Sequence, residues 1–531
     1  MVHYTLDGSE PTEQSAIFND SIFIASNTIL RLRAFANGSL PSTIKTHSYI
    51  FHDKDVTLPV VSIVTDSLWL YDTEQGIMGS LPNMKKKWKR PANFEYFPYK
   101  DSSAVINQIV QLKVGGMTSY KLNPIKPLIL SADKRIGKST LDYPFWKKEK
   151  PNVQSCESIF LRSSGQDCMY SYVRDVLSQL TFSRYVNVGY QAYQPVILYL
   201  NGVYKGLINL RERANEDFMS SNYGIKKVDV VKNWTILLHG DLVEFNKLEK
   251  LYTDSTTTLA TLDSIVDIEN FLNMMILSYI HQNTDYATNN VEWKERNNPK
   301  AKWHFIAKDL DASWGWNRFR NSKQSYKDPF LNDLLKVEPY DEYWDGAGYT
   351  TALFRKLMTF PSVRDEFIDR TTIYLGDFMD INNICLTFDS IQSIIDSELL
   401  SNQTLYHDYY GSNFNWAQEK GNMINWMYNR MDYIPEDLKL FFHLSDTYRL
   451  KITTDVPIVI NNIPLYYSGF NGKYYKDRTL TIKTKDKHQG RWIIQKVNNG
   501  VVQKEIVTTE SLQFTNRDDS QSVTIIYERK P

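Results

Sequence analysis

The chain has 531 residues, which exceeds one ordinary hydrophobic core and predicts two or three domains. Hydrophobic residues make up 42% of it and charged residues 23%, a composition that excludes a disordered protein. Its 61 basic and 61 acidic residues cancel, which argues against a nucleic-acid-binding protein and against a general attraction to charged membrane surfaces.

The sequence shows no transmembrane segment and no pattern typical of a zinc site. No apolar run is long enough to span a bilayer. Met1 leads directly into strand-like sequence without the basic and apolar parts of a secretory signal, so we expect the natural chain to be longer at this end. Cys156, Cys168 and Cys385 lack C-x-x-C spacing and indicate neither a zinc site nor a disulfide framework.

Residues 1–52 read as a small all-β unit. Short runs rich in β-branched and aromatic residues alternate with Gly, Asn and Pro turns, which is typical of strands joined by tight connections. We expect strands at residues 3–6, 21–24, 28–35 and 46–51.

Residues 57–212 combine strands with one helix. Strand patterns recur at residues 58–65, 107–114, 126–130, 158–161 and 194–200, with helical periodicity at 172–182. The Asn201-Gly202 pair between two apolar runs predicts a β-hairpin spanning 196–210.

The remaining sequence changes from helices to strands. Helical patterns follow at residues 268–281, 351–358, 362–374, 388–398 and 416–430. From residue 448 to the end, strand patterns return and suggest a second β-sandwich-like domain. The fold class expected is therefore α+β, with domains at 1–52, 57–443 and 448–531.

One stretch carries a candidate catalytic pattern. Asp285 and Asn290 have the D-x-x-x-x-N spacing of a protein-kinase catalytic loop, in which the Asp accepts the proton of the attacking hydroxyl and the Asn holds a metal ion. Asp309 follows the apolar strand 303–307, where a kinase places its second metal-binding carboxylate. The same residues are also compatible with an Asx-rich turn after a helix, and the spacing alone does not decide between the two.

A series of landmarks in order resembles the CotH (spore coat protein H) kinase-like family over residues 57–443. The landmarks are 87–92 with Glu95, 115–119 followed by Lys126-Pro127-Leu128, 161–167, 172–175, the hairpin 198–212 ending Leu-Arg-Glu, and 305–315. At the N-terminus, Tyr4-Thr5 with Asp7-Gly8-Ser9-Glu10-Pro11-Thr12 resembles a chitobiase/hexosaminidase C-terminal-like β-sandwich module.

The resemblance implies an atypical two-lobed kinase domain, with lobes at 57–212 and 213–443, flanked by small all-β sandwich-like domains. It implies transfer of the ATP γ-phosphate to Ser or Thr of secreted or surface proteins, with Mg2+ or Mn2+ as the metal. It also implies a bacterial, secreted or cell-surface location. The β domains are expected to contact cell-surface glycans or surface proteins.

The resemblance assigns roles to ten residues. Asp285 would be the catalytic base; Asn290, Asp309 and Asp311 would hold the metal; and Lys126 (alternative Lys121), Arg162, Arg174, Asp175, Leu210 and Glu212 would contact the nucleotide. The chain departs from ordinary kinases by lacking a G-x-G-x-x-G loop, with Gly115-Gly116 the nearest feature, and by having Asp-Leu-Asp at the metal position.

Two other functions remain open on the sequence. One is a catalytically silent scaffold that retains the kinase fold, and the other is a glycoside hydrolase using Asp309 and Asp311 as its carboxyl pair. The near P-loop at residues 132–140 has Ala in place of the first Gly and Pro144 soon after, so we interpret it as a basic hairpin turn.

Overall fold

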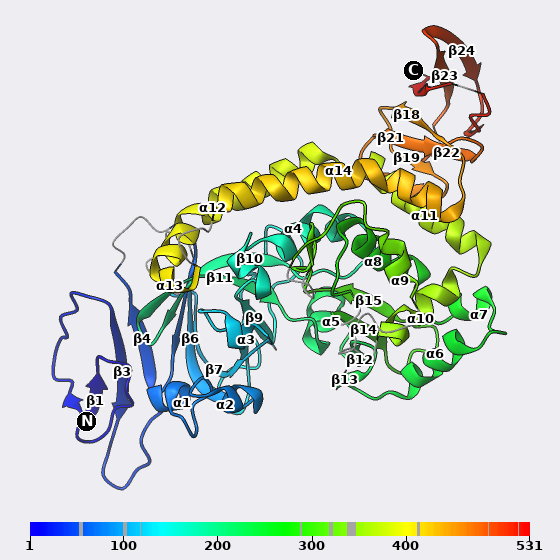
Figure 1. Ribbon diagram of the computed structural model, residues 1–531. Helices are drawn as coiled ribbons and strands as arrows, with labels where there is room; N and C mark the ends of the chain where they lie inside the picture. Colours follow the sequence, from blue (N-terminus) through cyan, green and yellow to red (C-terminus); the bar gives the residue numbers. More distant parts are fainter. Residues whose placement is uncertain are drawn as a thin grey trace. The chain divides into compact units, whose positions relative to one another are not determined.

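The computed structural model describes residues 1–51, 57–98, 103–116, 118–286, 289–317, 322–336, 347–410, 415–486, 488–518 and 520–530. The described chain combines helices with several β-sheets, which confirms the α+β class (Figure 1). The chain groups into two compact units, each assembled from segments that are distant in the sequence. The first comprises Met1–Val173, Gln191–Val228 and Asp389–Trp416, and the second comprises Arg174–Tyr190, Asp229–Phe388 and Ala417–Pro531.

The N-terminal segment of the first unit forms a four-stranded antiparallel sheet in the order β2-β1-β3-β4. Its strands are β1 (Val2–Thr5), β2 (Ala16–Ile17), β3 (Thr28–Ala34) and β4 (Lys45–Tyr49). The strand expected at residues 21–24 is wrong, since this segment is irregular and its Phe23 side chain is 91% exposed. An apolar run without a pairing partner therefore remained a loop.

A buried carboxylate joins this sheet to the rest of the first unit. Glu95 accepts hydrogen bonds from the Ser48 backbone N–H (3.0 Å), the Ser48 hydroxyl and the Asn107 amide (3.0 Å). Burial raises the pKa of Glu95 to about 7, against the opposing effect of the hydrogen bonds from Ser48.

Seven strands of the first unit close into a barrel. The ring runs β10-β11-β9-β8-β7-β6-β5, and the parallel pairing of β10 with β5 closes it. Asn201 and Gly202 take positive φ values of 49° and 76° in the turn between β10 and β11, which confirms the predicted hairpin. The strands are β5 (Val60–Val64), β6 (Arg90–Phe97), β7 (Ile106–Val114), β8 (Leu128–Ser131), β9 (Ser158–Arg162), β10 (Tyr193–Leu200) and β11 (Val203–Glu212).

Fully buried apolar side chains, among them Phe94, Val110, Leu112, Leu130 and Leu161, belong to the core of this barrel. They come from alternate positions along their strands, as in β7, where inward and outward residues alternate. The short helices of the first unit are α1 (Ser67–Tyr71), α2 (Leu81–Lys85), α3 (Ser119–Leu122), η1 (Gly165–Met169), α5 (Glu216–Tyr223) and α13 (His407–Tyr410).

The second unit contains a four-stranded sheet, β13-β12-β14-β15, that packs against helix α8 (Ile268–His281). The helix has the predicted bounds: the Asp267 side chain caps its first turn, and Gln282 ends it in the left-handed conformation. The Phe271 ring of α8 lies 4.8 Å from the Phe305 ring of the sheet. The strands are β12 (Val228–Lys232), β13 (Ile236–His239), β14 (Asn290–Glu295) and β15 (His304–Ala307).

Further helices lie before, between and after the strands of this sheet in the chain, and two of them are long. The predicted helical segments 388–398 and 416–430 lie within α12 (Ile381–Leu405) and α14 (Trp416–Phe442) (Figure 1). The others are α4 (Arg174–Thr181), η2 (Ser183–Tyr185), α6 (Val243–Thr253), α7 (Leu259–Asp263), α9 (Phe330–Leu334), α10 (Ala347–Leu357) and α11 (Pro361–Gly376), with the short strands β16 (Trp316–Asn317) and β17 (Ser322–Lys323). Among the described residues, no helix has the length and apolar character needed to cross a membrane.

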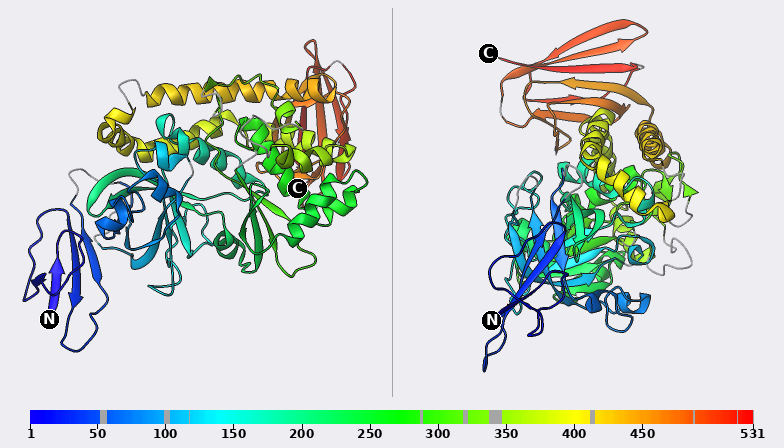
Figure 2. Two further views of the ribbon diagram at one scale, coloured as in Figure 1. Left: turned by 60° about the horizontal axis from the view of Figure 1, so that its bottom comes forward. Right: turned by 90° about the vertical axis from the view of Figure 1, so that its left-hand side faces the viewer.

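Two sheets complete the second unit, coloured orange to red in Figure 2. Their orders are β21-β18-β26-β23-β24 and β20-β19-β22-β25. Strand β21 packs against α11, where the Phe470 ring leaves no room for a side chain at Gly376. The strands are β18 (Thr447–Thr453), β19 (Ile458–Ile460), β20 (Ile463–Pro464), β21 (Gly469–Tyr475), β22 (Leu480–Thr484), β23 (Gly490–Asn498), β24 (Val501–Val507), β25 (Ser511–Phe514) and β26 (Ser522–Arg529).

Candidate active site

The loop that follows α8 carries Asp285. Its backbone N–H donates to the side-chain oxygen of Asn283 at 3.2 Å, so the Asx turn considered as an alternative is present. Asp285 is 2% exposed, and its Oδ2 accepts a hydrogen bond from the Asn289 amide. The turn and the candidate base therefore coexist, because the turn fixes the backbone while the Asp285 carboxylate contacts other groups.

A second loop runs beside the first. The Thr284 N–H and hydroxyl both donate to the Ala312 carbonyl, at 2.8 and 3.1 Å, and the Lys308 N–H donates to the Asn289 carbonyl at 3.3 Å. The two loops are thus fastened together on either side of Asp285. This arrangement brings the segment carrying Asp309 and Asp311 next to the segment carrying Asp285, as the sequence predicted.

Asp309 has a backbone conformation that separates it from the strand before it. Strand β15 ends at Ala307, and Asp309 takes a φ of 59°, in the left-handed region that Asp tolerates better than most residues. Asp309 is half-buried and Asp311 is buried. Because strand β15 ends before Asp309, the Asp309 and Asp311 carboxylates do not lie side by side on one strand face.

Asn290 lies in different surroundings from Asp285. It begins β14 opposite Ala307 and shares a strand face with Glu292. In the amide orientation that satisfies both of its ends, Asn290 donates to Glu292 Oε1 at 2.9 Å and accepts from the Trp234 indole N–H at 3.0 Å. Burial raises the pKa of Glu292 to about 8.

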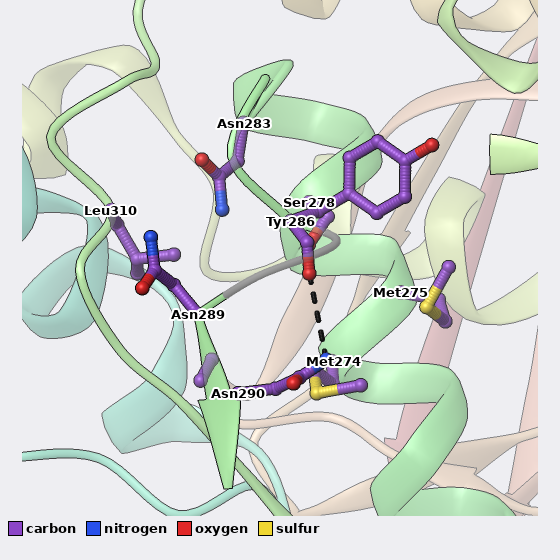
Figure 3. A pocket seen from close by; sticks show the side chains of 9 residues that line it. Met274, Met275, Ser278, Asn283, Tyr286, Asn289, Asn290 and Leu310 are labelled. Carbon is purple, nitrogen blue, oxygen red and sulfur yellow. Dashed lines mark hydrogen bonds between the residues drawn. The ribbon is translucent and has the colours of Figure 1, made fainter. Parts of the chain in front are cut away.

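A small pocket lies between α8, the start of β14 and the two loops. Figure 3 shows Asn289 pointing toward Leu310, whereas Asn290 points toward Met274 of α8. The carbonyl oxygen of Tyr286 lies 3.5 Å from the Asn290 amide, the contact that is dashed in the figure. The lining residues are Met274, Met275, Ser278, Asn283, Tyr286, Asn289, Asn290, Ala307 and Leu310.

The donor atoms around the two loops suit a hard divalent cation. Carboxylate and amide oxygens from Asp285, Asn289, Asp309 and Asp311 are the ligand type that Mg2+ and Mn2+ prefer. Across the described part of the chain, no three His, Cys, Asp or Glu side chains are grouped closely enough to form a metal site by themselves. A cation here would therefore need an amide oxygen or substrate oxygens in addition to the carboxylates.

Helix α4 contributes a buried acid to the second loop. Asp175 Oδ1 accepts the Leu310 backbone N–H at 2.9 Å and the Gln179 amide at 2.8 Å. Its neighbour Arg174, also buried, forms an ion pair with Glu419. The sequence assigned both residues to the nucleotide and did not predict the Asp175 contact, which joins elements 135 residues apart.

The first unit holds the other predicted nucleotide residues. The Lys126 Nζ donates to the Asn123 carbonyl at 2.8 Å, and burial lowers the pKa of Lys126. Arg162 ends β9 and is half-buried. Leu210 is fully buried in β11, where its carbonyl accepts from the Trp146 indole at 3.3 Å.

Sequence reasoning missed two lysines of the first unit. Glu212 is buried and accepts hydrogen bonds from Lys150 Nζ, at 2.5 Å, and from the Asn222 amide, at 2.7 Å. Burial, and the nearby charges of Arg213, Lys89 and Lys87, lower the pKa of Lys113 to about 8. The basic run at residues 85–90 was the available signal, but relating it to Lys113 required the pairing of β6 with β7 to be known.

Sequence comparisons match two parts of the chain to known families. A family model described as CotH kinase protein matches residues 116–246 and 239–434, more than half of the chain and including both loops of the site. A model described as Fn3 associated matches residues 1–49, which supports a separate N-terminal module, while its chitobiase-like character stays a prediction. A search of curated proteins found no match. The chain belongs to the CotH kinase protein family.

Proposed function

We propose that this protein is an atypical protein kinase that uses ATP with Mg2+ or Mn2+ and phosphorylates Ser or Thr of a protein acceptor. The observation that carries the proposal is the fastening of the two loops through Thr284 and Asn289, which sets Asp285 beside the segment of Asp309. Membership of the CotH kinase family supports a kinase-like protein. The two-lobed kinase architecture is part of the same proposal.

Asp285 is the base in this scheme. The acceptor hydroxyl oxygen forms a bond to the γ-phosphorus while the bond from that phosphorus to the β–γ bridging oxygen breaks, and ADP leaves. The proton of the hydroxyl passes to the Asp285 carboxylate, whose direction is set by the Asn289 amide. Such general base catalysis contributes about 10²- to 10⁴-fold to the rate.

Asp309, with Asp311 as the second candidate, would hold the metal ion. A bound Mg2+ would neutralise charge on the triphosphate. Asp285, Asp309 and Asp311 lie on two loops that are hydrogen-bonded to each other, so a cation bound there would also offset part of their negative charge. Lys126, Arg162, Arg174 and Glu212 remain candidate nucleotide contacts in this proposal.

Replacement of the base tests the proposal directly. Asp285→Ala should lower γ-phosphate transfer at least about 100-fold, because it removes the proton acceptor, while nucleotide binding persists. The matched control is Asp263→Ala, since Asp263 is 60% exposed and forms an ion pair with Lys302 at the surface of the second unit. Equal transfer by wild type and Asp285→Ala would refute the assignment.

A second candidate function is a catalytically silent scaffold. It is favoured by the burial of Asp285, at 2% exposed, and by the Asn289 hydrogen bond that its carboxylate already accepts. Thermal unfolding with Mn2+ and ATP separates the two candidates. A ligand present at a hundred times its dissociation constant stabilises a protein by about 2.7 kcal/mol, so no shift for the wild type would favour the scaffold.

We also propose that the acceptor is a secreted or surface protein, as the family resemblance implies. The N-terminal sheet and the C-terminal sheets would then space or dock the enzyme against surface proteins or glycans. Phosphoproteomics of secreted and surface fractions from cells with and without Asp285→Ala should show phosphosites that depend on the enzyme. Phosphosites confined to the cytosol would contradict this location.

A further inference from the structure

The two neighbouring asparagines at the start of β14 have different surroundings. Asn290 begins the strand and shares a face with Glu292, and this face packs against α8 through Phe305. Asn289 precedes the strand, and its carbonyl accepts the N–H of Lys308. Figure 3 shows the two amides pointing in different directions.

Hydrogen bonds within the protein satisfy both the nitrogen and the oxygen of the Asn290 side-chain amide, so this amide needs no ligand. Its nitrogen donates to Glu292 and its oxygen accepts from the Trp234 indole. It is 3% exposed. Turning this amide oxygen toward a cation would leave the indole N–H buried without an acceptor, a cost of about 1–3 kcal/mol.

The Asn289 amide, in contrast, has a hydrogen bond at its nitrogen but none at its oxygen within the described residues. Its nitrogen donates to Asp285 Oδ2, and it is half-buried at the edge of the pocket. Within the described residues, no donor contacts its side-chain oxygen. Asp309 directly follows Lys308, whose backbone N–H donates to the Asn289 carbonyl.

We infer that Asn289, and not the Asn290 of the D-x-x-x-x-N pattern, is the amide of the active site. Its nitrogen positions the Asp285 carboxylate and its oxygen is the ligand for the divalent cation, together with Asp309. Asn290 is a buried structural residue that joins β14 to Trp234. This inference rests on the proposed function, because it assigns a residue to the metal of that reaction.

The test compares the two single substitutions in the full chain. Mn2+ binding is measured by electron paramagnetic resonance in the presence of ADP, and thermal unfolding is measured without ligands. Asn289→Ala should weaken Mn2+ binding about 10- to 100-fold with little change in melting temperature. Asn290→Ala should lower the melting temperature and leave the Mn2+ affinity within about threefold of wild type.

Each result decides. A loss of Mn2+ affinity in Asn290→Ala without a loss in Asn289→Ala overturns the inference, as do equal losses in both. If Asn290→Ala does not fold, an unchanged Mn2+ affinity in Asn289→Ala still overturns it. If wild type with ADP binds no Mn2+, the proposed function itself fails, a result visible before any variant is compared.

Discussion

His281 shows how a buried side chain next to the site responds to its surroundings. It ends α8, is 1% exposed, and its Nδ1–H donates to the Leu277 carbonyl at 2.9 Å. The rings of Phe182 and Trp314 pack against it, at 6.0 and 5.3 Å between ring centres. Burial lowers the pKa of His281 from 6.5 to about 4, because the charged imidazolium is poorly solvated there.

This shift predicts acid sensitivity of the second unit. A folded-state pKa below the unfolded value means that the stabilisation is complete above pH 6.5 and is lost as pH falls toward 4. Between pH 7.5 and pH 5, wild type should lose about 2 kcal/mol more unfolding free energy than His281→Phe. Urea unfolding at the two pH values, followed by tryptophan fluorescence, measures the difference.

The control for this prediction is His407→Phe. The side chain of His407 is 71% exposed. This substitution should leave the pH dependence of unfolding unchanged. A wild-type protein and a His281→Phe variant with the same pH dependence would contradict the assignment of acid sensitivity to His281.

Residue identity in the candidate site could be predicted in part. Asp285, Asp309 and Asp311 were predicted together from their spacing after a helix and a strand, and the structure brings the two segments together, while the roles of the three residues stay predictions. The difference between Asn289 and Asn290 could not be predicted, since it depends on the residue at which β14 begins. A shift of one residue in a strand reverses the face on which a side chain lies.

Helix α4 is hydrogen-bonded to the loop that follows β15. The buried Asp175 carboxylate accepts the Leu310 N–H, in the turn where Asp309 takes its left-handed conformation. Without an acceptor, a buried N–H costs about 1–3 kcal/mol. We therefore expect Asp175 to stabilise the conformation of the loop that carries Asp309.

Asp175→Ala should open this loop locally. The backbone amide of Leu310 should exchange its hydrogen about 5- to 150-fold faster, which corresponds to about 1–3 kcal/mol. Hydrogen exchange with mass spectrometry on a peptide covering residues 303–312 measures the change. Asp175→Asn is the matched control, because its amide oxygen can still accept from Leu310; equal exchange rates in wild type and Asp175→Ala would disprove the role.

Local elements were more predictable than the contacts between them. Helix α8 has the predicted bounds because its apolar residues, its Asp267 cap and its left-handed end are all encoded within 16 residues. The β10–β11 hairpin follows from Asn201-Gly202 in the same way. The contact of Asp175 with Leu310 was missed, since nothing near either residue in the sequence indicates the other.

The architecture of each unit depends on pairings between distant segments. In the first unit, Val60 lies beside Ile197 in the parallel pairing that closes the barrel. Strand propensity predicted the two strands and their apolar character, but not that they pair. Closure is a property of seven strands together, and the periodicity of a single strand carries no information about it.

In the second unit, α11 provides the attachment for the C-terminal sheets. Asp369 accepts hydrogen bonds from the Tyr474 hydroxyl, the Asn461 amide and the Arg478 guanidinium, each at 2.9 Å. Burial alone would lower the pKa of Arg478. The neighbouring carboxylates of Asp369 and Asp365 have the larger, opposite effect, so the pKa of Arg478 is raised above its ordinary value. The Asp369 carboxylate thus binds three side chains of the C-terminal sheets.

Asp369→Ala should loosen the C-terminal sheets from α11. Removing one partner of a largely buried ion pair leaves the Arg478 charge without its neighbour, at a cost of about 3–5 kcal/mol. Limited proteolysis should then release a fragment cut near residues 443–447 sooner than in wild type. Asp365→Ala is the control, since Asp365 also pairs with Arg478 but is 60% exposed, and exposed pairs contribute about 0–1 kcal/mol. Equal protection of wild type and Asp369→Ala would show that apolar packing such as Phe470 against Gly376, and not Asp369, holds the sheets.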